Sequence, residues 1–148
     1  MKKLISLTLC FLLFFTNISY AKTKNISTSI KDLEIVRDKI SLMVKEISGD
    51  KHIDISKFKE EVKCCESILA TRANQLSKDY SNESNIELKA AYSSLLYVSS
   101  LYALSLNSIM VYMHNNSKSQ YFIDICTTYR DGTLALDEIK LNFWNWWL

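Results

Sequence analysis

Three cysteines are the residues of this chain whose types and spacing best fit a defined chemistry. Cys64, Cys65 and Cys126 lie in the body of the chain, whereas Cys10 lies in its apolar N-terminal segment. Neighbouring side chains on a helix point about 100° apart, so Cys64 and Cys65 cannot bridge each other within a helix. Cys65 and Cys126 each belong to an apolar helical face, and we therefore predict a Cys65–Cys126 disulfide. Cys64 is then left as an inert thiol or as a bridge to a second copy.

No other residue pattern indicates a catalytic or metal site. His52 and His114 are far from each other and from the cysteines in the sequence, and the chain has no glycine-rich phosphate loop, HExxH or GxSxG motif. Acidic residues such as Glu60, Glu61 and Glu66 fall on an expected solvent face of a helix, where they are typical surface residues. The sequence therefore predicts a protein that is not an enzyme, with no catalytic residue, no metal site and no cofactor.

The C-terminal sequence FWNWWL contains all three tryptophans of the chain. On a helix, one apolar stripe here consists of Leu136, Ile139, Phe143 and Trp147. A second stripe, about 100° away, consists of Leu141, Trp144 and Leu148. A single core covers one stripe, so we predict the second, Leu141, Trp144 and Leu148, as a partner-binding surface. Two alternatives remain: the aromatic residues lock the terminus onto the domain, or they insert at a membrane interface.

The N-terminal residues have the order of a secretory signal peptide. Lys2 and Lys3 precede an apolar run of about a dozen residues, and Ser19 and Ala21 are the small residues before a cleavage site. We predict cleavage after Ala21, which makes residues 1–21 a signal peptide and residues 22–148 the mature domain. Cleavage removes both lysines and lowers the formal net charge from +2 to zero. A neutral chain has no basic excess with which to hold nucleic acid, and export exposes its cysteines to an oxidising compartment.

Composition and periodicity predict an all-α fold for residues 22–148. The chain has no proline and only two glycines, too few for the tight turns of an all-β domain. Apolar residues recur every three or four positions, which predicts a small single-domain bundle of four to five helices. Expected helix starts are capping boxes at Ser29 with Asp32 and at Ser84 with Glu87, and a cap near Ser56. Gly49 and Gly132 are expected to end helices, with Thr133 opening a fifth one.

One stretch leaves two interpretations open. From Ala90 to Met113 no residue is charged, and as a helix this length could cross a bilayer. Six serines and one asparagine lie within these residues, however, and polar groups in lipid need partners that a single helix cannot supply. We therefore favour a buried central helix, apolar nearly all round, over a membrane-anchored envelope protein that spans the bilayer with these residues.

Together these features predict an exported bacterial protein, periplasmic or secreted, that acts by binding another protein. In size, export, helicity and cysteine use, the chain resembles the immunity proteins that neutralise periplasmic toxins delivered by competing bacteria. The resemblance implies stoichiometric binding of a toxin or envelope enzyme, and it includes no motif that would identify the binding residues. Self-association as a homodimer is the other expected partnership, with no nucleic acid and no membrane involved.

Overall fold

The protein is a four-helix bundle. The computed structural model describes residues 2–49, 54–114 and 119–145, and their side chains at 24–49, 54–114 and 119–142. Its helices are α1 (Lys2–Ser48), α2 (Ile55–Asn82), α3 (Ile86–His114) and α4 (Ser119–Asn145), and they alternate in direction. The predicted all-α fold is confirmed, with four helices in the described residues.

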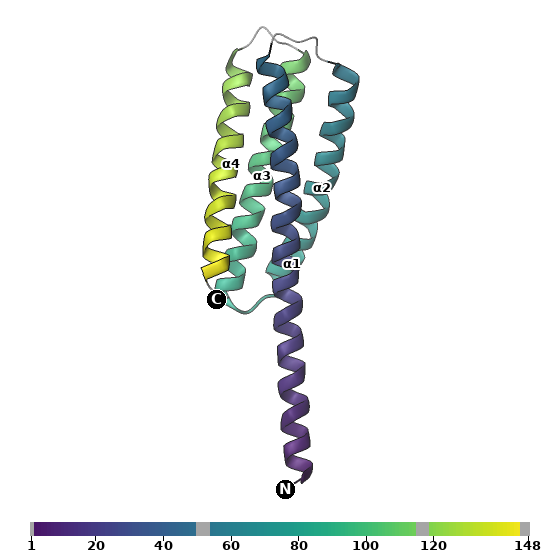
Figure 1. The fold of residues 1–148 in the computed structure, drawn as a ribbon, viewed down its shortest axis with the longest axis vertical. Coiled ribbons are helices and arrows are strands. Elements are labelled where there is room, and N and C mark those ends of the chain that lie inside the picture. Colours follow the sequence, from purple (N-terminus) through teal and green to yellow (C-terminus); the bar gives the residue numbers. More distant parts are fainter. Residues whose placement is uncertain (1, 50–53, 115–118, 146–148) are drawn as a thin grey trace.

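The helices form a diamond in cross-section. α1 lies in front of α3, with α4 on one side of this pair and α2 on the other (Figure 1). Among the described residues, α1 and α3 each contact all three other helices, whereas no Cα of α2 comes within 8 Å of a Cα of α4. The connections between helices are short, which makes neighbours antiparallel as expected.

α1 contributes the first side of the core. Six of its residues, spaced three or four apart, are buried: Ile26, Ile30, Leu33, Val36, Ile40 and Met43. The helix does not begin at Ser29 as predicted, because the backbone is already helical there and the Ser29 hydroxyl donates to the carbonyl of Asn25 (2.9 Å). Asp32, the expected partner of that cap, instead forms an ion pair with Arg72 of α2.

The ends of the helices are set by glycine and by side-chain caps. α1 ends at Ser48, as predicted from Gly49, but this glycine does not have the left-handed conformation typical of a glycine at a helix end. Asp54 caps α2 by accepting from the amides of Ser56 (3.0 Å) and Lys57 (3.2 Å). The cap of α3 is Asn85, whose side chain accepts from the amide of Leu88 (2.9 Å), so the predicted Ser84 capping box is wrong.

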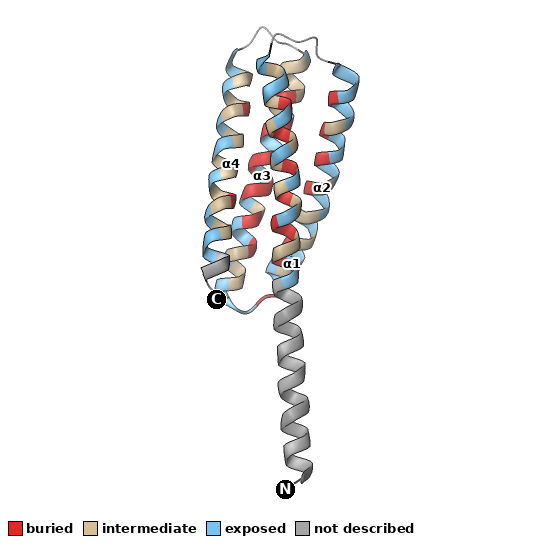
Figure 2. Ribbon diagram, in the orientation of Figure 1, coloured by how far each residue is buried: buried red, intermediate tan, exposed pale blue. Residues whose placement is uncertain are grey.

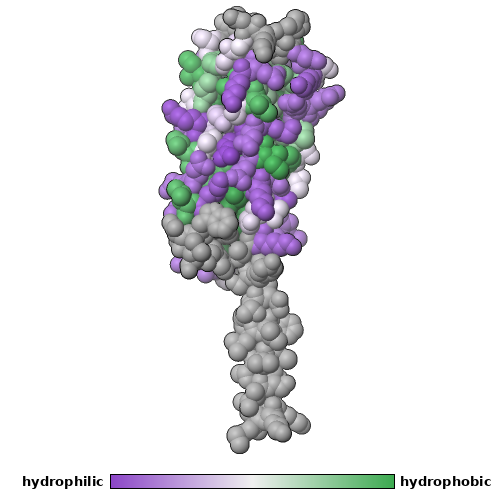
Figure 3. Space-filling view, viewed as in Figure 1, coloured by the Kyte–Doolittle hydropathy of each residue, from purple (hydrophilic) through white to green (hydrophobic). Residues whose placement is uncertain are grey.

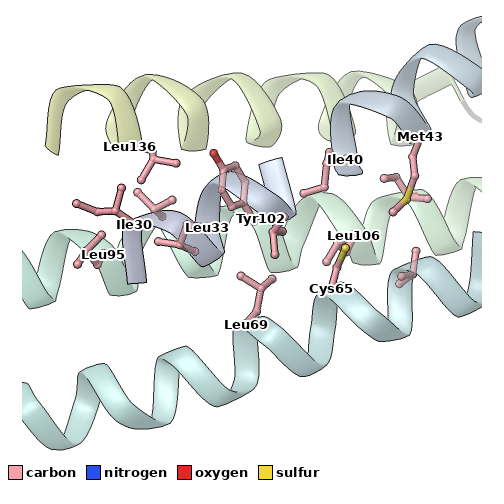
Figure 4. Close-up of a cluster of buried hydrophobic side chains, with 14 of the residues drawn as sticks. Ile30, Leu33, Ile40, Met43, Cys65, Leu69, Leu95, Tyr102, Leu106 and Leu136 are labelled. Atoms are coloured by element: carbon pink, nitrogen blue, oxygen red, sulfur yellow. The ribbon is translucent and has the colours of Figure 1, made fainter. Parts of the chain in front are cut away.

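α3 supplies the largest share of the core. Its buried residues are Tyr92, Leu95, Val98, Ser99, Leu101, Tyr102, Ser105, Leu106 and Ile109. Figure 2 shows that the buried residues of all four helices lie toward the middle of the bundle, and Figure 4 shows Leu33, Leu69, Leu106 and Leu136, one from each helix, within the same cluster. α3 is the one helix of the described chain that is long and apolar enough to cross a membrane, and 44% of its most apolar window is buried inside the bundle.

α4 is continuous through Gly132, so the predicted helix end at this residue and the predicted fifth helix are wrong. Gly132 is buried against the ring of Tyr102: a Cβ at this position would lie 2.7 Å from Cε1 and 2.9 Å from Cδ1 of that ring. Thr133 lies within the helix, and its hydroxyl donates to the carbonyl of Tyr129 (2.8 Å). The glycine therefore makes room for a core tyrosine rather than ending a helix.

Candidate functional site

Metal-ligating side chains do not cluster in the described residues: no group of three His, Cys, Asp or Glu side chains is placed to hold a metal ion. Glu83, the one acidic residue that is buried in the described part of the chain, accepts hydrogen bonds from the amides of Ser84 (2.9 Å) and Asn85 (3.0 Å) and so orders the α2–α3 connection. The candidate functional features of the described residues are exposed surfaces of the helices.

The three cysteines of the bundle are free thiols. Cys64 is exposed, Cys65 is fully buried on α2, and Cys126 is half-buried on α4. A disulfide requires Cα atoms within about 7 Å, and α2 and α4 lie on opposite corners of the diamond, where no such pair comes within 8 Å. The predicted Cys65–Cys126 disulfide therefore does not fit this arrangement of helices.

Burial makes Cys65 a packing residue. Loss of solvation raises the pKa of its thiol to about 11, so the thiol is protonated and unreactive at neutral pH. Burial likewise raises the pKa of Tyr102 to about 12. Burial, with the negative charges of Asp79 and Glu83, raises the pKa of Tyr92 to about 12. These buried groups stay neutral over the physiological range, and they fill the core.

The outer side of α4 has three exposed apolar residues, separated by the exposed polar residues Thr127, Arg130 and Glu138. Leu141 of the predicted binding stripe is 67% exposed, and Leu134 (62%) and Ile123 (53%) are exposed on the same side of the helix. Their spacings of eleven and seven residues are close to whole numbers of turns, which aligns the three side chains over about 27 Å. We call Ile123, Leu134 and Leu141 the α4 ridge.

The other two residues of the predicted binding stripe are not placed by this structure. The backbone of Trp144 belongs to α4, but its side chain lies outside the described residues, as does all of Leu148. The sequence prediction missed Leu134 and Ile123 because it ended a helix at Gly132, which would have separated them. The three residues align only because α4 is one continuous helix.

The outer side of α3 is uncharged and partly exposed. Its exposed positions include Ser93, Tyr97, Ser100, Leu104 and Asn107, which we call the α3 face. Tyr97 is 58% and Leu104 is 54% exposed, so the predicted central helix is buried on one side and exposed along the other. By contrast, hydrophilic residues predominate on the α1 side of the molecule, where hydrophobic residues are scattered (Figure 3).

A shallow groove of about 420 Å³ lies between α2 and α3, beside the α3 face. Its lining is mostly small residues: Ala70, Ala73, Ser99, Ser100 and Ala103, with Glu66, Leu69 and Leu96 completing it. Small side chains let another chain come close to the two helices. The groove shares Ser100 with the α3 face, so the two form one continuous surface.

Comparisons with protein families, with curated proteins and with solved structures found no match to this chain. The features that a function must explain are the α4 ridge, the α3 face and the groove beside it. All three present apolar side chains outward from regular helices. In a soluble protein, such surfaces are typical of sites that contact other proteins.

Proposed function

We propose that the protein is exported, loses residues 1–21, and acts without catalysis by binding another protein through the α4 ridge. The observation that supports this most is the pair Leu134 and Leu141, two of the most exposed large apolar side chains of the described residues. They lie two helical turns apart on one rigid helix. Because the helix backbone is already ordered, binding at these positions costs less conformational entropy than ordering a loop would.

The packing is compatible with removal of a signal peptide. Ile26 is the first buried residue that the structure describes, and it follows the predicted cut after Ala21 by five positions. Cleavage there leaves every described core residue in the mature chain. The proposed export therefore requires no rearrangement of the bundle from Ile26 onward.

The partner we propose is a toxin or an envelope enzyme, as for the immunity proteins that the chain resembles. Complete burial of a leucine contributes about 1.5–3 kcal/mol, and each ridge leucine already has part of its surface covered in the free protein. A contribution of about 1.4 kcal/mol corresponds to a tenfold change in Kd. Loss of both leucines is therefore expected to raise the Kd of a complex by about tenfold to a hundredfold.

The test replaces both ridge leucines with serine. The tagged protein is co-expressed with the product of each neighbouring gene, and complex formation and protection from any toxic product are measured. We expect one product to co-purify stoichiometrically with the wild type, and the double variant Leu134→Ser/Leu141→Ser to lose both complex and protection. Unfolding by urea should be nearly unchanged, because both side chains are exposed.

The matched control is Leu42→Ser on α1, where the leucine is 56% exposed on a different helix from the ridge. This variant should bind and protect like the wild type. Equal loss in Leu42→Ser and in the ridge variant would contradict a role for the ridge. Failure of every neighbouring product to bind would contradict the proposed function itself.

A membrane-anchored protein is the second candidate, and the observation that favours it is the length and hydropathy of α3. In that case the residues from Ala90 to Met113 would face lipid. The exposed polar residues of the α3 face, Ser93, Ser100 and Asn107, make this the weaker proposal, because lipid offers them no hydrogen-bond partners.

A further inference from the structure

The α3 face has the spacing of a helix-pairing seam. Its members, Ser93, Tyr97, Ser100, Leu104 and Asn107, are separated by four, three, four and three residues, and half-exposed Val111 continues the pattern. A 3.5-residue repeat keeps a stripe facing one partner helix along its whole length. The seam points away from the core that α3 forms with the other three helices.

Large and small residues alternate along this seam. Tyr97, Leu104 and Val111 are large, and they alternate with Ser93, Ser100 and Asn107. In a parallel pair of identical helices, each large residue would meet its own copy and each serine would meet a serine. In an antiparallel pair with its two-fold axis level with residue 102, Ser93 faces Val111, Tyr97 faces Asn107 and Ser100 faces Leu104 of the second copy.

We propose that two copies of this chain associate antiparallel through the α3 face, with Ser100 of one copy beside Leu104 of the other. This inference goes beyond the proposed function, since it concerns a different helix and a different partner. A two-fold interface must be complementary to itself. The alternation of size meets that requirement, because each large residue packs against a smaller residue of the second copy.

Charge supports the second copy as the occupant and also favours this register. No residue from Ala90 to Met113 is charged, and the middle of this run lies within one residue of the proposed axis. The two uncharged runs therefore cover each other almost completely. A shift by one heptad would bring Glu87 and Lys89 of each copy opposite uncharged residues of the other, at the cost of their desolvation.

The polar groups of the seam can be covered without being left unpaired. The hydroxyl of Ser100 already donates to the carbonyl of Tyr97 within the helix (2.7 Å). Tyr97 and Asn107 face each other across the proposed pair, and a phenol and an amide can each donate and accept. A single polar layer of this kind fixes register in paired helices at some cost in stability.

The size of the seam predicts weak association. From Ser93 to Val111 a helix is about 27 Å long, and a face about 10 Å wide covers roughly 270 Å². Stable interfaces bury about 800 Å² on each partner, so the seam alone is too small for a tight complex. The adjoining groove between α2 and α3 offers additional contact area. We expect a dimer in the micromolar range that forms and dissociates rapidly.

Disulfide trapping tests the register. In a Cys64→Ser background, one preparation carries Ser100→Cys and another carries Leu104→Cys, and the two are mixed and oxidised with diamide. The mixture should form a covalent dimer much faster than either preparation alone. A mixture of Asp38→Cys and Leu42→Cys, both on exposed positions of α1, is the control and should remain slow.

Sedimentation over a range of concentrations tests the association itself. The wild type should become increasingly dimeric, Leu104→Lys should remain monomeric, and Leu42→Lys should behave like the wild type. A monomer at every concentration would overturn the proposal, as would trapping no faster than in the α1 control. Faster trapping between Ser93→Cys and Leu104→Cys would overturn the register. The ridge variant Leu134→Ser/Leu141→Ser should dimerise normally, so failure of this inference is distinguishable from failure of the proposed function.

Discussion

Leu106→Ala lowers the free energy of unfolding by about 2–5 kcal/mol, the range for removing a fully buried leucine side chain. Leu106 is completely inaccessible to solvent in the shared core of the bundle (Figure 4). The truncation loses the transfer free energy of the removed carbons and leaves a cavity that the helices fill only in part. Urea unfolding followed by circular dichroism measures the change.

Leu104→Ala is the matched control, two residues away on the same helix. Leu104 is more than half exposed on the α3 face, so the same truncation should change stability by less than about 0.5 kcal/mol at low protein concentration. Comparable losses at both positions would contradict the inward and outward sides assigned to α3. This pair of variants therefore tests the central helix directly.

Gly132→Ala is the second change with a large expected effect. In most helices, alanine in place of glycine stabilises by about 1 kcal/mol. Here the added Cβ would lie 2.7 Å from Cε1 of Tyr102, a ring that is completely buried. Relief of this contact requires movement of packed elements at a cost of about 1–3 kcal/mol. The difference predicts a net destabilisation of up to about 2 kcal/mol instead of the usual stabilisation, measured by urea unfolding.

Gly49→Ala distinguishes packing from backbone effects. A Cβ at Gly49 would make only ordinary contacts, the nearest at 3.5 Å, and this glycine does not have positive φ. Its replacement should be neutral or slightly stabilising.

A double variant tests the contact between Gly132 and Tyr102. Combining Gly132→Ala with Tyr102→Leu should cost less free energy of unfolding than the sum of the two single changes. Strict additivity would contradict the contact between Gly132 and Tyr102 as the cause.

The fold was predictable where one periodic pattern specifies one buried face. The stripe from Leu33 to Met43 on α1, and Phe58, Val62, Cys65 and Leu69 on α2, are buried as their spacing indicates. The error at Gly132 arose because a glycine near a polar segment is typical of a helix end. Only the position of Tyr102 on the neighbouring helix reveals the packing reason for that glycine.

The candidate surfaces were less predictable, because they depend on how the helices are arranged. Leu141 was expected to be exposed and is exposed, but Ile123 aligns with it only because α4 continues through Gly132. The Cys65–Cys126 prediction assumed that two apolar faces meet, and periodicity does not reveal which helices lie on a diagonal. The α3 face was missed because an uncharged run of residues looks equally apolar on every side.

Cell fractionation tests the account's central claim, an exported bundle with α3 in its core. A C-terminally tagged chain is expressed in a bacterium, membranes are washed with carbonate, and the mature N-terminus is determined by mass spectrometry. We predict that the protein begins at Lys22 and is released with the soluble periplasm or the medium. A protein that stays in the membrane after carbonate would contradict the account, and it would indicate that the residues from Ala90 to Met113 span the bilayer.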